Sequence, residues 1–71
     1  MTVDELIERA KVPRYYRTRI RNFALNQDFR TVDQLLSIDW RTYSRRGLGK
    51  KGRDELRRAL ASQGFTPIWV Y

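Results

Sequence analysis

Residues 45–56 decide the fold, and they read Arg-Arg-Gly-Leu-Gly-Lys-Lys-Gly-Arg-Asp-Glu-Leu. Glycines on both sides of Leu48 allow the backbone to take positive φ and to approach another surface closely. We expect a helix to begin after Gly52, and a helix start presents unpaired backbone N–H groups and the positive end of the helix dipole. The stretch therefore predicts a tight hairpin between helices, with an anion site such as a phosphate site in its second half.

The composition indicates one small globular domain, with 71 residues of which 41% are hydrophobic and 32% charged. The sequence has no cysteine and no histidine, which excludes disulfides, zinc fingers and the usual general base. We therefore expect no metal, no cofactor and no enzymatic activity. Since neither a membrane-spanning apolar run nor a signal peptide is recognisable, we expect a cytoplasmic protein without a membrane partner.

The net charge is +7, and it is unevenly distributed. Residues 1–10 contain only one of the 15 basic residues but three of the eight acidic ones. The positive field of residues 11–71 favours nucleic acid as a partner, and hence an association with the nucleoid. The alternative is that the charge only keeps a small domain in solution.

Two helices are predicted before residue 27. Thr2 and Glu5 form a capping box that opens a helix over about residues 3–11. Its apolar stripe consists of Val3, Leu6, Ile7 and Ala10. Pro13 closes this helix and suits the first turn of a second helix, over about residues 14–26. The expected core face of the second helix consists of Tyr16, Ile20, Phe23 and Ala24.

The second helix is rich in arginine, on more than one face. One face carries Arg14, Arg17 and Arg21, and a separate strip beside Tyr15 carries Arg19 and Asn22. These side chains either reach a nucleic acid or only solvate the exterior of the helix, and the spacing leaves both interpretations open.

Short helices are predicted between residues 26 and 43. Asn26 is a plausible helix end. Thr31 and Gln34 form a second capping box before a short helix that buries Val32, Leu35 and Leu36. Ser37 or Asp39 starts another short helix through Trp40 and Tyr43. We interpret Trp40 as a core residue and not as a platform for base stacking.

The last helix is predicted to begin after Gly52 and to run to about residue 63, with Asp54 and Glu55 in its first turn. Its inward positions are Leu56, Ala59 and Leu60. Gly64 is typical of the position after a helix end, and Phe65 is expected to fold back on the helix. Residues 66–71 form an apolar tail that packs onto the core or, alternatively, is an exposed strand that needs a partner. The predicted fold is all-α: a bundle of four to five short helices over residues 1–65 containing a helix-hairpin-helix motif, followed by the tail.

The stretch from about residue 19 to 65 resembles the C-terminal domain of the bacterial RNA polymerase α subunit. Residues 47–56 are similar to that family's Asn-Leu-Gly-Lys-Lys-Ser-x-x-Glu-Ile, and Thr-Val-Asp-Gln-Leu-Leu at 31–36 resembles its Thr-Val-x-x-Leu-Leu. The resemblance implies DNA binding in the minor groove, mostly through phosphates, and docking by transcription regulators. The family's hairpin contacts would map to Gly49, Lys51, Gly52 and Glu55.

The family's Arg-x-x-Asn pair would map to Arg19 and Asn22, although apolar spacing aligns Arg21 with that arginine instead. This chain departs from the family at Arg53, where a small or apolar residue is usual, and at Gly52, which replaces a serine. The helix predicted over residues 3–11 has no counterpart, so a complete chain would be a stand-alone relative of the polymerase domain.

The function expected from these features is a small module for double-stranded DNA, contacting phosphates and an A·T-rich minor groove in transcription regulation. The candidate contact residues are Arg19, Arg21, Asn22, Arg45, Arg46, Gly47, Gly49, Lys50, Lys51, Gly52 and Arg53. With about five phosphates neutralised, log affinity should fall with log salt at a slope of roughly −4 to −5. RNA remains a possible polyanion by charge alone. The alternative function is a protein-interaction adaptor that contacts RNA polymerase or a transcription regulator, of phage or mobile-element origin.

Overall fold

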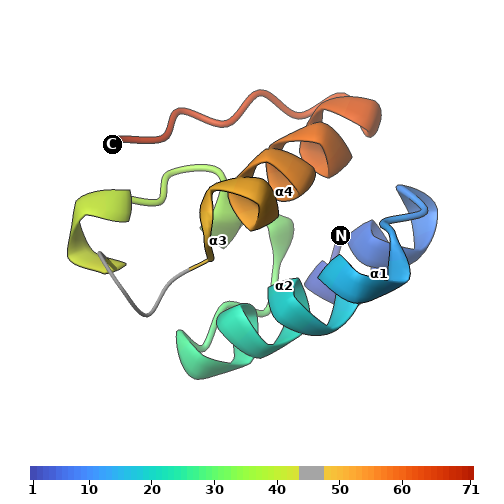
Figure 1. Ribbon diagram of the computed structural model, residues 1–71. Coiled ribbons are helices and arrows are strands. Elements are labelled where there is room, and N and C mark those ends of the chain that lie inside the picture. Colours follow the sequence, from blue (N-terminus) through green and yellow to red (C-terminus); the bar gives the residue numbers. More distant parts are fainter. Residues whose placement is uncertain (44–47) are drawn as a thin grey trace.

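Helices dominate the computed structural model, which describes residues 1–43 and 48–71 (Figure 1). In chain order the elements are α1 (Val3–Arg9), α2 (Arg14–Asn26), α3 (Val32–Leu35), the 3-10 helix η1 (Trp40–Tyr43) and α4 (Lys50–Ser62). The described residues form isolated β-bridges but no β-strand. The prediction of a small all-α bundle is therefore confirmed.

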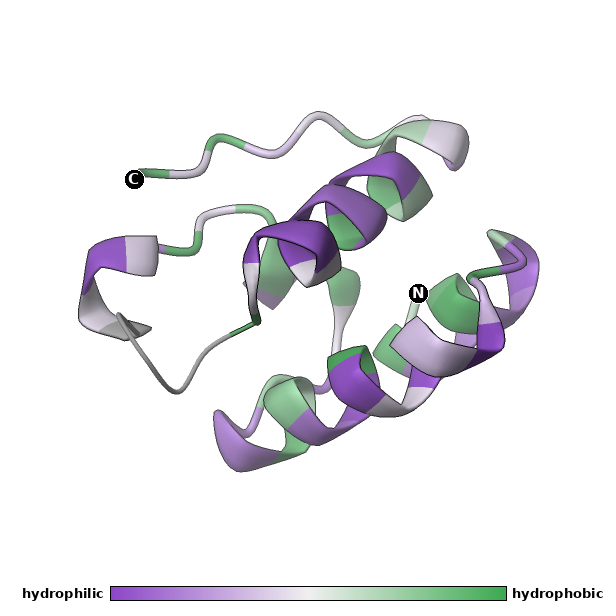
Figure 2. Ribbon diagram, viewed as in Figure 1, coloured by the Kyte–Doolittle hydropathy of each residue, from purple (hydrophilic) through white to green (hydrophobic). Residues whose placement is uncertain are grey.

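The core lies where α1, α2 and α4 pack on one another, and apolar and polar residues alternate along these helices (Figure 2). Its fully buried side chains include Leu6, Ile7, Ile20, Val32, Leu35, Leu56 and Leu60. Trp40 is 4% exposed and stacks on Phe23 with ring centroids 5.3 Å apart. The interpretation of Trp40 as a core residue is thus confirmed.

The predicted capping boxes are present. The Thr2 hydroxyl accepts a hydrogen bond from the Glu5 backbone N–H, and the Glu5 carboxylate accepts one from the Thr2 N–H, each at 3.1 Å. The bond from the Thr2 backbone lowers the pKa of Glu5. Ahead of α3, the Gln34 side-chain oxygen accepts from the N–H groups of Arg30 at 2.6 Å and Thr31 at 3.2 Å. Both helices therefore begin where the sequence predicted.

The three long helices end in the same way, with one residue in the left-handed region and the next turned back. The left-handed residues are Lys11 (φ 52°), Asp28 (φ 57°) and Gly64 (φ 85°). The residues after them donate backbone hydrogen bonds into the last helical turn: Val12 to Ile7 (3.3 Å), Phe29 to Ala24 (2.8 Å) and Phe65 to Leu60 (2.9 Å). This is the Schellman arrangement, in which the returning residue is apolar and packs on the helix. The predicted end at Gly64 is confirmed, whereas α1 ends at Arg9, two residues before the predicted end.

The start of α4 differs from the prediction. The helix begins at Lys50, ahead of Gly52, and its N-cap Gly49 has an extended backbone (φ −64°, ψ 171°) without positive φ. Asp54 and Glu55 therefore lie beyond the first turn, which contains no acidic residue. Leu48 packs closely on this turn, since a Cβ on Gly52 would lie 3.2 Å from a Leu48 methyl carbon. Gly52 thus lies inside the helix, where its lack of a side chain leaves room for Leu48.

Residues 30–40, which we call the central segment, bind both terminal segments through backbone hydrogen bonds. At the N-terminal side, Val3 donates to Arg30 (3.0 Å) and Val32 donates to Met1 (2.9 Å). The tail, residues 66–71, runs parallel to the end of the central segment. Its bonds are Ile68 to Leu36 (2.8 Å), Val70 to Ile38 (3.1 Å) and Trp40 to Val70 (2.8 Å).

The tail packs onto the core through one of its side chains. The Trp69 indole meets Trp40 edge to face, with centroids 5.1 Å apart, and its Nε1 donates to the Leu35 carbonyl at 2.7 Å. Ile68, Val70 and Tyr71 remain exposed, by 73%, 43% and 61%. The prediction that the tail packs back is confirmed for Trp69, while its neighbours leave an apolar outer surface.

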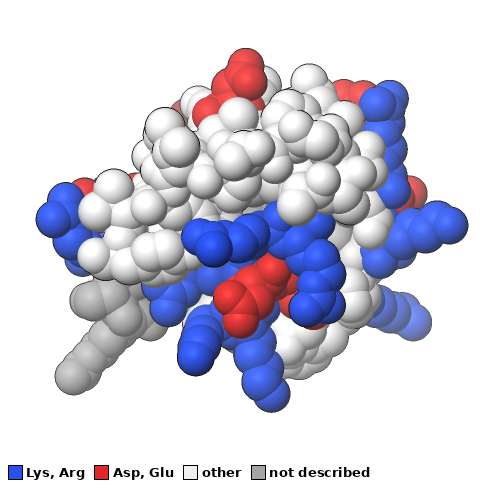
Figure 3. Space-filling view, turned by 90° about the horizontal axis from the view of Figure 1, so that it is seen from above, with Lys and Arg blue, Asp and Glu red and all other residues white. Residues whose placement is uncertain are grey.

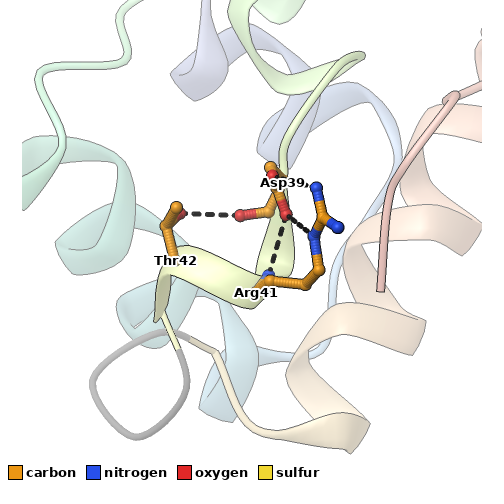
Figure 4. Close-up of polar contacts among 3 residues, drawn as sticks. All are labelled: Asp39, Arg41 and Thr42. Carbon is orange, nitrogen blue, oxygen red and sulfur yellow. Dashed lines mark hydrogen bonds and ion pairs between the residues drawn. The ribbon is translucent and has the colours of Figure 1, made fainter.

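Asp39 organises the turn that carries η1 (Figure 4). Its carboxylate accepts from the Arg41 backbone N–H at 3.0 Å and from the Arg41 guanidinium at 2.9 Å. The Thr42 hydroxyl donates to the Asp39 carbonyl at 2.7 Å. The guanidinium bond lowers the pKa of Asp39. Of the two predicted starts, Ser37 or Asp39, the structure uses Asp39.

Candidate nucleic-acid interface

A groove runs between α2 and the start of α4, and it consists of two cavities that share Tyr15 and Arg19. The larger, of about 540 Å³, is lined by Tyr15, Thr18, Arg19, Asn22, Phe23, Asn26 and Leu48. The smaller, of about 180 Å³, is lined by Tyr15, Tyr16, Arg19, Gly49, Lys51 and Gly52. We call these two cavities together the groove.

One wall of the groove is a continuous face of α2. Positions 15, 18, 19, 22 and 26 follow the spacing that puts side chains on one side of a helix. The Arg19 guanidinium stacks over the Tyr15 ring at 4.8 Å from its centroid. Tyr15 is 62% exposed and meets Tyr16 edge to face at 5.0 Å. This wall therefore offers a cation and an aromatic ring side by side.

The opposite wall is the first turn of α4. Gly49 has no side chain to cap the helix, and no side-chain cap is formed there. The first backbone hydrogen bond of the helix runs from the Arg53 N–H to the Gly49 carbonyl, at 2.9 Å. The N–H groups of the helical residues before Arg53 therefore have no intrahelical acceptor. Lys50 and Lys51 place positive charge at the positive end of the helix dipole, an arrangement that an anion would stabilise.

The structure separates the two arginines that the sequence could not rank. Arg19 and Asn22 lie in the groove, and Arg19 reaches the cavity of Gly49 and Lys51. Arg21 points to α1, where its Nε lies 3.1 Å from an Asp4 carboxylate oxygen. The groove thus brings together Arg19, Asn22, Gly49, Lys51 and Gly52, without Arg21.

Arg53 lies on the other flank of α4, together with Arg57. The Arg53 guanidinium carbon is 5.5 Å from the ring centroids of both Trp40 and Tyr71, and its buried Nε has no hydrogen-bond partner among the described residues. Arg57 covers Trp69 at 5.2 Å and Tyr71 at 5.5 Å, and it donates to the Tyr71 hydroxyl. The departure from the family pattern at Arg53 has a physical account, because this arginine packs beneath the tail.

Among the remaining predicted residues, those that the structure describes do not line the groove. Arg45, Arg46 and Gly47 lie outside the described residues. Glu55 is half-buried on the α1 side of α4, 3.5 Å from the Arg58 guanidinium. Lys50 is exposed in the first turn beside the groove, without being one of its lining residues.

Sequence reasoning missed the roles of Thr18 and Asn26 in the groove and took Tyr15 only as a neighbour of Arg19. The helical spacing of these positions was readable from the sequence. What could not be read was which face of α2 meets the start of α4, because that depends on the packing of both helices against the core.

Charge is unevenly spread over the face seen from above Figure 1 (Figure 3). Lysine and arginine side chains gather in the lower centre of the view around a small acidic patch and stand again at its left and right margins, while the upper centre is mostly uncharged. Of the described residues, no group of three or more acidic side chains is placed to hold a metal ion. In the same residues, no helix combines the length and apolarity needed to cross a membrane.

Comparisons with protein-family models, with curated proteins and with solved structures found no match to this chain. The resemblance of residues 19–65 to the polymerase α-subunit domain therefore stays a prediction from the sequence.

Proposed function

We propose that this protein is a small DNA-binding module that holds phosphates at the start of α4 and inserts Arg19 into the minor groove. The observation that carries the proposal is the groove, in which Arg19 of α2 lines one cavity with Asn22 and the other with Gly49 and Lys51 at the start of α4. The unpaired N–H groups of the first turn are suited to one phosphate, and the two lysines to its neighbours.

Arginine in a narrow minor groove favours A·T tracts, because the negative potential is strongest there. Such contacts are largely independent of base sequence, which suits a module that acts beside other regulators in transcription, at the nucleoid in the cytoplasm. The net charge of +7 would speed the encounter with DNA.

Salt dependence tests the proposal. Three described cations lie at the groove: Arg19, Lys50 and Lys51. Log affinity for an A·T-rich duplex should then fall with log salt at a slope of about −3, to which contacts outside the described residues would add. Fluorescence anisotropy over a range of salt concentrations measures the slope. A flat dependence, or no binding at low salt, contradicts DNA binding.

A matched pair of double variants locates the contact. Lys50→Gln with Lys51→Gln should reduce the slope by about 2 units. Arg9→Gln with Arg30→Gln removes the same charge from side chains that pair with Glu5 and Asp28, and should leave the slope nearly unchanged. Equal effects of the two double variants would mean that only net charge matters. An RNA duplex of the same sequence serves as the second titrant, and tighter binding to it would replace DNA as the ligand.

A second candidate function, a protein-interaction adaptor, is favoured by the tail. Ile68 is 73% exposed and Tyr71 is 61% exposed, while backbone hydrogen bonds to the central segment hold the tail in an extended conformation. An ordered apolar strip of this kind suits docking on RNA polymerase or on a transcription regulator. Because Trp69 anchors the tail, deleting residues 66–71 would disturb the fold, and Ile68→Asp is the sharper variant. Loss of binding to purified RNA polymerase in Ile68→Asp, with DNA affinity unchanged, would support the adaptor function.

A further inference from the structure

The larger cavity of the groove has a lining that phosphate binding does not require. It is an open depression of about 540 Å³, and its polar side chains Thr18, Arg19, Asn22 and Asn26 are exposed. Phosphate contacts need only donors at a surface, whereas this cavity also has two aromatic residues, Tyr15 and Phe23, in its lining.

The polar groups of the cavity match the edge of a nucleobase. Thr18, Asn22 and Asn26 make no side-chain hydrogen bond to any other described residue. An asparagine amide offers a donor and an acceptor together. A phosphate can use only the donor of an amide, whereas a base edge presents both donors and acceptors and can use the amide oxygen as well.

Tyr15 and Arg19 provide a stacking surface beside these amides. The guanidinium covers one face of the Tyr15 ring at 4.8 Å, and Tyr15 is 62% exposed. Arg19 itself makes no ion pair with a described residue, in contrast to Arg21, which is held by Asp4. Aromatic rings and arginine planes are the surfaces on which proteins stack unpaired bases.

The stacking surface and the phosphate site adjoin each other. Tyr15 and Arg19 line both cavities, so a base in the larger cavity would place its own phosphate near Gly49 and Lys51. We propose that the larger cavity accepts an unstacked base, so that the protein prefers DNA with an unpaired nucleotide over an intact duplex. This inference rests on the proposed DNA-binding function and specifies its substrate.

Three DNA probes of one sequence test the preference: an intact duplex, the duplex with a bulge of unpaired adenines, and the duplex with an abasic bulge of equal length. The abasic probe keeps the flexibility of the bulge and removes only the bases. We expect the adenine bulge to bind about 5-fold or more tightly than the abasic bulge, as base stacking implies. Fluorescence anisotropy at one fixed salt concentration measures all three affinities.

Variants of Tyr15 identify the surface. Tyr15→Leu should abolish the preference for the adenine bulge over the abasic bulge, measured as the ratio of the two affinities, whereas Tyr15→Phe should retain this ratio. Because Tyr15 is largely exposed, both variants are expected to fold, and circular dichroism checks this.

The possible failures are distinguishable. Equal affinity for the adenine and abasic bulges, or a Tyr15→Leu variant that weakens all three probes alike, would overturn the base pocket and leave DNA binding in place. Absence of binding to every probe would overturn the proposed function together with it.

Discussion

Both flanks of α4 carry basic side chains, but the surroundings of these side chains differ between the two flanks. On the groove flank, Lys51 faces Arg19 of α2, and neither makes an ion pair with a described residue. On the tail flank, Arg53 and Arg57 lie against the rings of Trp40, Trp69 and Tyr71. A basic side chain is available to a polyanion on one flank, whereas on the other it is part of the packing.

This difference shows why a count of positive charges is a poor guide to a binding surface. Lys51 and Arg53 are two residues apart on a helix, so their side chains point to nearly opposite sides. The side on which the tail packs turns an expected phosphate contact at Arg53 into a structural cation.

Replacing Trp69 should have the largest effect, on the tail flank. Trp69→Ala removes the edge-to-face contact with Trp40 and the hydrogen bond to Leu35, and should lower the free energy of unfolding by about 3 kcal/mol. Urea unfolding followed by circular dichroism measures the loss. Ile68→Ala is the control, because this side chain is 73% exposed and its loss should cost less than about 0.5 kcal/mol. Equal stabilities of the two variants would show that the tail contributes little to the fold.

Replacing Arg19 should have the largest effect on the groove flank. Arg19→Gln should weaken DNA binding roughly tenfold, which corresponds to about 1.4 kcal/mol. Arg21→Gln removes the same charge from the same helix but breaks only the exposed pair with Asp4, so its DNA affinity should stay close to that of the parent. If both variants lost affinity equally, the position of Arg19 in the groove would be irrelevant to binding.

Capping α4 should separate stability from binding. A Cβ on Gly49 meets no atom within 4 Å, so Gly49→Ser fits without strain. The serine hydroxyl would accept a hydrogen bond from an N–H group of the first turn and stabilise the protein by about 0.3 kcal/mol. The same bond competes with a phosphate for that N–H, so DNA affinity should fall slightly while the unfolding midpoint rises. A variant that binds DNA more tightly would argue against phosphate capture by these amides.

Acid should weaken the turn beside the tail. The pKa of Asp39 in the folded protein is lowered by its bond from Arg41, below the ordinary value of 3.8. The charged carboxylate therefore contributes stability above about pH 4, and this contribution is lost as the pH falls through the lowered pKa. Asp39→Asn should reduce the drop in unfolding midpoint between neutral pH and acid. The change is expected to be the smallest of the series because the pair is exposed, and an identical drop in both proteins would contradict it.

Local features of the fold were predictable from the sequence because their determinants are neighbours in the chain. The capping boxes of Thr2 and Thr31, both ends of α2 and the glycine end of α4 were all predicted correctly. The start of α4 was predicted wrongly. In the sequence Gly52 looks like a residue that precedes the helix, and its contact with Leu48 cannot be seen there. Lys11 and Asp28 gave no signal of their left-handed conformation, because it is the apolar residue after each that turns the chain back.

The candidate site was predictable only in its parts. Helical spacing grouped Arg19 with Asn22 and the hairpin pattern marked Gly49 and Lys51, but no periodicity states which face of α2 meets α4. The tail was harder still. Its hydrogen bonds to the central segment join backbone atoms that are far apart in the sequence. The apolar side chains of the tail do not indicate which backbone groups these bonds join.

The central segment also couples the local unfolding of the two ends of the chain. In most domains the terminal residues fray independently and at little cost. Here the amides of Val3 and of Val70 both donate to carbonyls of residues 30–40, and that segment donates to Met1 and Val70 in return. Loosening these eleven residues would release the first and last residues together, so amide hydrogen exchange at both ends should report one common opening.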